Sequence, residues 1–506
     1  MLAALSYAVQ GDVGLNLTDE GLFWYVTERT AAGDVPLRDV RSYEPGRYYW
    51  SAPWLRVLGP GVRALRISLA VLQAVGLVLA FLLLRRIVPA VAPLAVLGLV
   101  LVVWMWPMYR SFENVAVLAL LLAAARLVER PIASRWRSAG VVVGLAAFVR
   151  IDHGVYGALA CLLLLVFATT RLNGVHPGVA LGNWTLGVIV GYSPMFLLAV
   201  LAPGFVRGFT ANLGYMARTT LWAGTVSLPL PVPWLWVELP KLGGSSLADA
   251  AALVALSTLF TLLPAVLALA GCLAFRARGA ATPQQAQLAA AAAVGLPYLS
   301  HTFSRADLQH LTPTAMALVV ALVALVSSLP TTARRIAGIV AAPLALAVTY
   351  LVVVTETPYG IRLRRPELYV RSEVAGDPLW LNRSTVEIID SVKRATAAHV
   401  GARPMLVIPL WPGLYPILGK QSPLWEVYAL FPEPEAQQRE AIARLRRLGV
   451  DWVVLADIVP EPREDLRFKN THRLMWEHFQ QDFDWLVVDS RHPFIHLLRR
   501  RVAAQP

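Results

Sequence analysis

Two adjacent carboxylates stand beside a run of aromatic residues near the start of the chain. Asp19 and Glu20 precede three aromatic residues, and Arg47 and Tyr48 belong to a second aromatic stretch at 43–50. A carboxylate can accept the proton of a sugar hydroxyl, and a flat aromatic ring can pack against the C–H face of a sugar. The pattern therefore favours a carbohydrate site, although an amphipathic helix at the membrane interface, where Trp and Tyr collect, explains it equally well.

A second set of ionisable residues interrupts or borders long apolar stretches. Such groups are costly at membrane depth and indicate function by default. Transfer of a sugar from a lipid-linked donor needs a base for the acceptor hydroxyl and cations for the departing phosphate. Carboxylates supply the base, and the planar guanidinium of Arg matches phosphate oxygens. The candidate substrate-binding residues are Arg47, Tyr48, Arg110, Glu113, Arg150, Asp152, His153, Arg305, Asp307 and His310. For Arg305 and Asp307 the alternative is a pair that only fixes a helix end.

The elements that must position these residues follow from composition. Of the 506 residues, 57% are hydrophobic and 15% are charged. Residues 1–355 contain 37 charged residues, whereas the remaining 151 contain 40. The sequence therefore predicts a polytopic α-helical membrane module over 1–355, with about 10–11 transmembrane helices, and a soluble domain over 356–506. This excludes a cytosolic enzyme, a fibrous protein and a disordered tail.

Apolar runs give the expected helices of the membrane module. They lie at 65–84, 87–108, 112–128, 139–150, 153–169, 179–201, 247–275, 285–300, 311–329 and 336–355. We expect 139–169 to form two short helices that meet at the outer surface; a single long helix would reverse the orientation of everything downstream. In the C-terminal domain, strand-like runs at 405–409, 452–455 and 485–488 and a helical stretch at 435–448 predict an α/β fold. A loop at 411–416 is interpreted as a turn rather than an acceptor site.

The placement of basic residues predicts the orientation. The net charge is +13, from 41 Arg and four Lys against 32 acids. Many Arg lie in short loops, which is typical of the positive-inside rule and argues against nucleic-acid binding. With the first loop, 10–62, placed outside, the inner loops collect eleven Arg and one acid. We therefore expect a multi-pass protein of the inner (cytoplasmic) membrane, in contact with membrane lipids, with an extracytoplasmic C-terminal domain.

Two features concern the chain start and the cysteines. Only nine fairly apolar residues precede Gln10, too few for a membrane helix. Either a first helix is absent or Met1 is an internal start, and we expect the second. Cys161 and Cys272 have neither a CxxC spacing nor a nearby His. We therefore predict no disulfide framework, no metal site and no cofactor.

Three motifs resemble the GT-C superfamily of membrane glycosyltransferases, which includes protein O-mannosyltransferases and lipid A aminoarabinose transferases. They are the acidic pair Asp19-Glu20 with the aromatic helix after it, the run GVVVGLAAFVRID at 140–152, and the run SRADLQHL at 304–311. The resemblance covers most of 10–355. It implies that Asp19 is the catalytic base, with Glu20 as its substitute, and that the donor is a polyprenyl-phosphate sugar.

The sequence thus predicts a glycosyltransferase that moves a sugar from a polyprenyl phosphate to an envelope acceptor (a lipid, glycan or protein) on the outer face of the membrane. Inversion and retention are both compatible with the residues. The alternative is a non-enzymatic transporter or scaffold protein of envelope glycan or lipid assembly. A transporter is expected to carry its ionisable groups near the bilayer midplane and to repeat its pattern in two halves, whereas the charges here cluster at one face.

Overall fold

The computed structural model describes residues 1–172, 174–218, 232–242, 246–460 and 463–501. Within these residues the chain forms two compact units. The helical unit comprises 1–11, 66–201 and 232–364, and the mixed unit comprises 12–65, 202–218 and 365–501. Residues from the first loop therefore fold together with the C-terminal residues in one unit.

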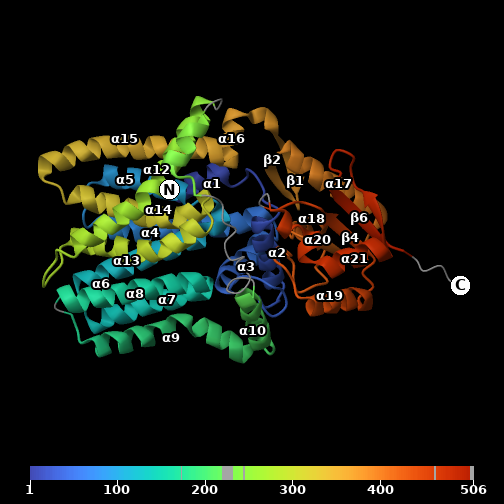
Figure 1. Ribbon diagram of the computed structural model, residues 1–506, viewed down its shortest axis with the longest axis horizontal. Coiled ribbons are helices and arrows are strands. Elements are labelled where there is room, and N and C mark those ends of the chain that lie inside the picture. Colours follow the sequence, from blue (N-terminus) through green and yellow to red (C-terminus); the bar gives the residue numbers. More distant parts are fainter. Residues whose placement is uncertain (173, 219–231, 243–245, 461–462, 502–506) are drawn as a thin grey trace. The chain divides into compact units, whose positions relative to one another are not determined.

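Each of the ten apolar runs corresponds to a helix. Nine of these helices lie within the helical unit, and α4, which begins in the mixed unit, belongs to the helical unit from Arg66 onward. Figure 1 shows α6, α7, α8 and α9 lying side by side. The principal helices are α1 (Leu2–Gln10), α4 (Val62–Leu84), α5 (Val91–Trp104), α6 (Ser111–Glu129), α7 (Ala133–Val149), α8 (Ile151–Arg171), α9 (Pro177–Leu201), α12 (Leu247–Ala274), α13 (Pro283–Ser304), α14 (Leu308–Ser327) and α15 (Thr331–Glu356). The short helices are η1 (Met108–Arg110), α11 (Leu235–Glu238), η3 (Leu239–Leu242) and α16 (Pro358–Arg364).

Seven helical segments in the described part of the chain are long and apolar enough to cross a membrane. They are α4, Met108–Glu129, α8, α9, α12, α14 and α15. The protein is therefore a multi-pass membrane protein. The most apolar window of Met108–Glu129 is 78% buried, whereas that of α15 is only 11% buried. Met108–Glu129 is thus an interior helix, and α15 offers nearly its whole circumference to lipid.

Helices α7 and α9 approach each other through glycines. A Cβ atom added at Gly144 would lie 2.5 Å from the carbonyl oxygen of Val188, and one added at Gly187 or Gly191 would also meet backbone of α7. Small residues four apart allow such close backbone contact between membrane helices. The glycines of the run at 140–144 therefore serve helix packing.

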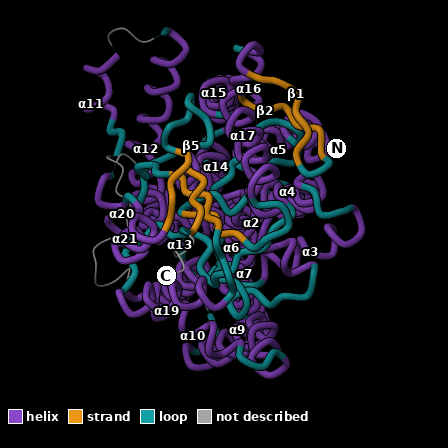
Figure 2. The backbone as a smooth tube through the Cα atoms, turned by 90° about the vertical axis from the view of Figure 1, so that its right-hand side faces the viewer, coloured by secondary structure: helices purple, strands orange, loops and turns teal. Residues whose placement is uncertain are grey.

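The mixed unit contains two sheets, whose strands are orange in Figure 2. An antiparallel hairpin pairs β1 (Tyr369–Val374) with β2 (Asp377–Asn382). The second sheet has the order β3-β4-β6-β5. In it β3 (Met405–Ile408) runs parallel to β4 (Trp452–Ala456), while β6 (Ile495–Arg500) is antiparallel to both β4 and β5 (Phe483–Val487).

Helices cover the larger sheet and complete the mixed unit. Leu445, Phe468 and Phe479 pack on residues of β3, β4 and β6 in one apolar core. The helices are α2 (Asp19–Ala31), α3 (Gly46–Leu58), α10 (Phe205–Met216), η4 (Pro366–Leu368), α17 (Arg383–His399), α18 (Leu414–Leu418), α19 (Glu435–Arg447), η5 (Glu464–Leu466), α20 (Phe468–Thr471) and α21 (Arg473–Asp482). The predicted fold class, a polytopic helical membrane protein with a C-terminal α/β domain, is confirmed.

Candidate functional site

A buried carboxylate stands at the centre of a polar network in the helical unit. Glu113 lies in the first turn of α6. Its Oε1 accepts a 2.6 Å hydrogen bond from Nη1 of Arg150, and its Oε2 lies 3.7 Å from Nη1 of Arg110. Burying a charge is costly unless it is paired, and here two guanidinium groups face one carboxylate.

Arg150 occupies the junction between α7 and α8. Its backbone is extended, with φ −166° and ψ 124°, so that α7 ends at Val149 and α8 begins at Ile151. The interpretation of 139–169 as two helices is therefore confirmed. Arg150 also lies 3.0 Å from Oδ2 of Asp152, and the fully buried His153 ring places Nδ1 2.6 Å from the hydroxyl of Tyr298.

A second part of the network sits at the start of α14. Asp307 is the N-cap residue, and its Oδ1 accepts from the backbone N–H of His310 at 2.8 Å. The same oxygen lies 2.7 Å from Nδ1 of His310, and Oδ2 lies 2.8 Å from Nε of Arg305. The local pair between Arg305 and Asp307 that the sequence offered as an alternative is thus present.

The two parts are joined by Arg110, whose Nη1 lies 3.5 Å from Nε2 of His310. The structure therefore brings together eight of the predicted residues, drawn from three separate segments: Arg110, Glu113, Arg150, Asp152, His153, Arg305, Asp307 and His310. The three arginines and three carboxylates among them give a net charge of zero when both histidines are neutral.

Sequence reasoning missed three aromatic members of this network. The His301 ring lies 4.9 Å from that of His310, and its Nε2 is 3.9 Å from Oε2 of Glu113. Tyr156 and Tyr298 pack on each other with ring centroids 4.7 Å apart. Tyr298 and His301 are three residues apart on α13, so they share one helix face. This spacing of three residues was the signal in the sequence from which the shared position of Tyr298 and His301 could have been predicted.

The other predicted residues belong to the mixed unit. Asp19 is the first residue of α2 and is half-buried, and its backbone N–H donates to Oδ1 of Asn16 at 2.9 Å. Tyr428 donates its hydroxyl to Oδ1 of Asp19 at 3.1 Å. Glu20 is buried, and its Oε2 accepts from the backbone N–H of Asn16 at 3.3 Å. Acidic residues in a first turn are favoured by the helix dipole.

Arg47 and Tyr48 lie at the start of α3 and are buried. The Arg47 guanidinium lies 4.8 Å from the centre of the Tyr43 ring. The Tyr48 hydroxyl accepts from the backbone N–H of Tyr43 at 3.2 Å, and its ring packs on Phe23. Burial raises the pKa of the Tyr48 hydroxyl well above its ordinary value. Tyr48 is a packing residue in this structure, and no part of its side chain is exposed for a substrate.

The loop at 411–416 packs against α2. A Cβ atom at Gly21 would lie 2.6 Å from the backbone nitrogen of Gly413, and the N–H of Gly413 donates to the carbonyl of Leu17 at 3.1 Å. The hydroxyl of Tyr25 accepts from the backbone N–H of Ser422 at 2.8 Å. These contacts fix the helix that carries Asp19 against the C-terminal residues of the same unit.

Comparison with known proteins shows the fold. No family model and no curated protein matches the chain. The crystal structure of ArnT from Cupriavidus metallidurans bound to undecaprenyl phosphate superposes with a TM-score of 0.56 at 15% identity, covering 100% of this chain and 98% of that one. The apo structure of the same protein gives 0.54 at 14% identity, covering 98% and 95%. The likeness covers nearly the whole length of both chains, so this chain shares the overall fold of ArnT.

Proposed function

We propose that the protein is a membrane glycosyltransferase that uses a polyprenyl-phosphate sugar as donor and an envelope molecule as acceptor. The whole-chain likeness to an ArnT structure that holds undecaprenyl phosphate is the observation that carries the proposal. The Arg-rich network of the helical unit supports it, because guanidinium groups pair with phosphate oxygens through two parallel hydrogen bonds.

Asp19 is assigned the role of base. Its carboxylate takes the proton of the acceptor hydroxyl while the acceptor oxygen forms a bond to C1 of the sugar. The bond between C1 and the phosphate oxygen breaks, and the electron pair leaves with the polyprenyl phosphate. A cation is needed to stabilise the charge on that departing phosphate, and Arg305 stays the predicted candidate for this role. Glu20 is the substitute base. Tyr48 is not assigned a substrate contact, because its side chain is buried.

The deciding experiment mixes the purified protein with a radiolabelled polyprenyl-phosphate sugar and a membrane acceptor fraction. We expect label in the acceptor with wild type and none above background with the Asp19→Asn variant. Transport or scaffold function would leave the label on the donor lipid with both proteins.

The proposal also assigns the reaction to the outer face of the inner membrane, and orientation can be tested separately. Replacing Cys161 and Cys272 gives a background for single exposed cysteines, because they are the only two in the chain. Cysteines at Arg85 and Arg334 should react with an impermeant reagent only after lysis, and one at Arg447 should react in intact spheroplasts. The opposite pattern would place the mixed unit in the cytoplasm.

A further inference from the structure

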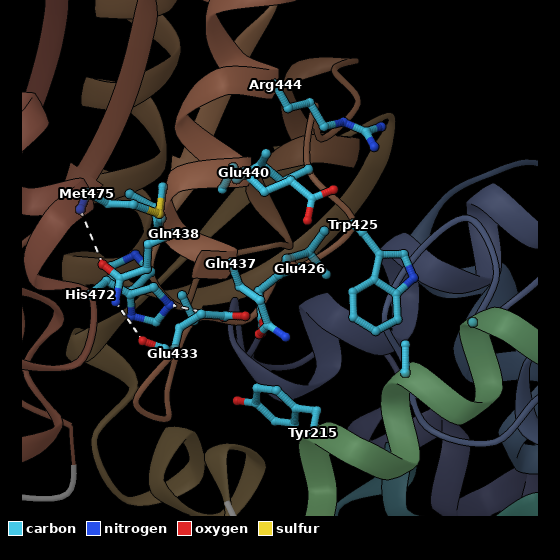
Figure 3. A pocket seen from close by; sticks show the side chains of 18 of the residues that line it. Tyr215, Trp425, Glu426, Glu433, Gln437, Gln438, Glu440, Arg444, His472 and Met475 are labelled. Carbon is cyan, nitrogen blue, oxygen red and sulfur yellow. Dashed lines mark hydrogen bonds and ion pairs between the residues drawn. The ribbon is translucent and has the colours of Figure 1, made fainter. Parts of the chain in front are cut away.

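The mixed unit contains a cavity of about 550 Å³ that the proposed chemistry does not use. Figure 3 shows its wall, formed by α10, the loop at 424–429, α19 and the start of α21. Its volume falls within the range of about 300–1,000 Å³ that is typical of small-molecule sites. All of its lining residues belong to the mixed unit.

Internal contacts hold the polar groups of this cavity in place. Arg41 pairs with Glu426, and its guanidinium lies 3.2 Å from the centre of the Tyr215 ring. Glu433 lies 3.5 Å from Nε2 of His472. Trp425 donates its indole N–H to a backbone carbonyl at 3.1 Å. The aromatic and charged groups are therefore positioned before any ligand arrives.

The charge pattern of the lining identifies the class of ligand. Four guanidinium groups and three carboxylates line it: Arg38, Arg207, Arg218, Arg444, Glu426, Glu433 and Glu440. Burial raises the pKa of the Glu426 carboxyl, against the lowering effect of Arg41. A polyphosphate is disfavoured, because the lining carboxylates would repel its negative charge. Mixed donors and acceptors beside the indole ring of Trp425 suit a molecule whose hydroxyl groups both donate and accept and whose C–H face is flat, which is a saccharide.

The loop that lines the cavity also contacts Asp19 through one of its residues, Tyr428. Val427 and Ala429 line the cavity, whereas Tyr428 between them does not. The Tyr428 hydroxyl instead donates to Oδ1 of Asp19 at 3.1 Å. A ligand in the cavity would therefore contact the same loop that holds the carboxylate assigned as base.

We propose that this cavity binds a saccharide portion of the acceptor. The assignment to the acceptor rests on the proposed transferase function, whereas binding of a saccharide does not.

Saturation-transfer NMR on the full chain in lipid nanodiscs, with no donor present, tests the binding. The probes are N,N′-diacetylchitobiose, mannobiose and maltose. We expect at least one of them to receive saturation from the wild-type protein. Glu440→Gln and Arg207→Ala change exposed lining residues and should weaken binding about tenfold each, as expected for loss of a hydrogen bond to a charged group. Trp425→Ala should weaken it further, and Trp425→Phe should restore part of it.

Arg439→Ala is the matched control, because Arg439 is an exposed residue of α19 that does not line the cavity. It should bind the probes as wild type does. The proposal is overturned if none of the three sugars receives saturation, or if Glu440→Gln and Arg207→Ala bind as tightly as Arg439→Ala.

Further outcomes separate this inference from the proposed function. Asp19→Asn should bind the saccharide as wild type does while losing transfer. In the transfer assay, Glu440→Gln should raise KM for the acceptor and leave kcat unchanged. Transfer with an unchanged acceptor KM in that variant would refute the cavity assignment alone. Saccharide binding without any transfer by wild type would refute the proposed function and leave the saccharide site intact.

Discussion

The carboxylates of the two units stand in opposite surroundings. In the helical unit Glu113 is buried between Arg110 and Arg150. In the mixed unit Asp19 is half-buried and accepts a hydrogen bond from the hydroxyl of Tyr428. A carboxylate held between two cations is a poor proton acceptor, because protonation would remove its ion pairs with both of them. The difference favours Asp19 as a base and Glu113 as a structural anion that holds cations in place.

The sharpest test of this contrast is Asp19→Asn. The change keeps size and the contact with Tyr428 but removes the base, and positioned proton transfer contributes about 10²–10⁴ in rate. We expect kcat for sugar transfer to fall by that factor with normal folding and membrane insertion. Glu20→Gln is the neighbouring control and should be affected far less. Full turnover by Asp19→Asn with an inactive Glu20→Gln would move the role to Glu20.

Glu113→Gln tests the structural half of the contrast. The variant removes the buried carboxylate that faces both Arg110 and Arg150, and leaves Arg150 with Asp152 as its remaining carboxylate partner. Removing one partner of a buried ion pair typically costs about 3–5 kcal/mol. We expect a large decrease in the thermal unfolding midpoint, together with loss of donor binding. Wild-type stability combined with a selective loss of kcat would instead show that Glu113 acts in the chemistry.

The membrane helices and part of the network were predictable from the sequence because their signals are local. Each apolar run became a helix, and Arg150 and Asp152 marked a helix junction. Tyr298 was missed because its partner, His153, is 145 residues away in the chain, and only the packing of α8 against α13 brings them together. The burial of Tyr48 was not predictable, because a run of aromatic residues does not reveal which of them face the interior.

In the mixed unit, short apolar runs revealed β3, β4 and β5, whereas the hairpin of β1 and β2 was not predicted. That hairpin turns at Ala375 and Gly376, both with positive φ. Such a turn favours glycine or asparagine at both central positions, and Ala375 gives no such signal. The cavity was also beyond sequence reasoning, because it combines residues of α10 with residues of α19 and α21 that lie more than 200 positions later in the chain.

Arg305 distinguishes phosphate binding from a purely local ion pair. If Arg305 binds the donor phosphate, Arg305→Ala should weaken donor binding by about 1.5–3 kcal/mol, the value of a charge-assisted hydrogen bond. Arg305→Lys should weaken it less, because it keeps the charge but loses the fork of donors.

The comparison with Asp307 completes this test. If Arg305 only pairs with Asp307, the double variant Arg305→Ala/Asp307→Ala should be milder than either single variant, because it leaves no charge unpaired. Donor affinity measured on all four proteins gives the coupling free energy. Restored donor binding in the double variant would assign Arg305 to the local pair and refute the phosphate role.

The smallest expected effect concerns the geometry that presents Arg150 to Glu113. Arg150 follows α7 directly, and α7 is set against α9 by glycines, so a shift of α7 would move this guanidinium. A Cβ at Gly144 would lie 2.5 Å from Val188 O and 2.7 Å from Tyr192 N, and backbone atoms cannot rotate away. Gly144→Ala should therefore destabilise the helical unit by about 1–3 kcal/mol, the usual cost of overpacking.

Gly182→Ala on α9 is the matched control, because a Cβ there meets nothing within 4 Å, and alanine is the better helix former. It should leave the unfolding midpoint unchanged or raise it slightly. Equal midpoints for the two variants would mean that α7 can move away from α9 without cost, and the position of Arg150 would then have to be fixed by its ion pairs alone.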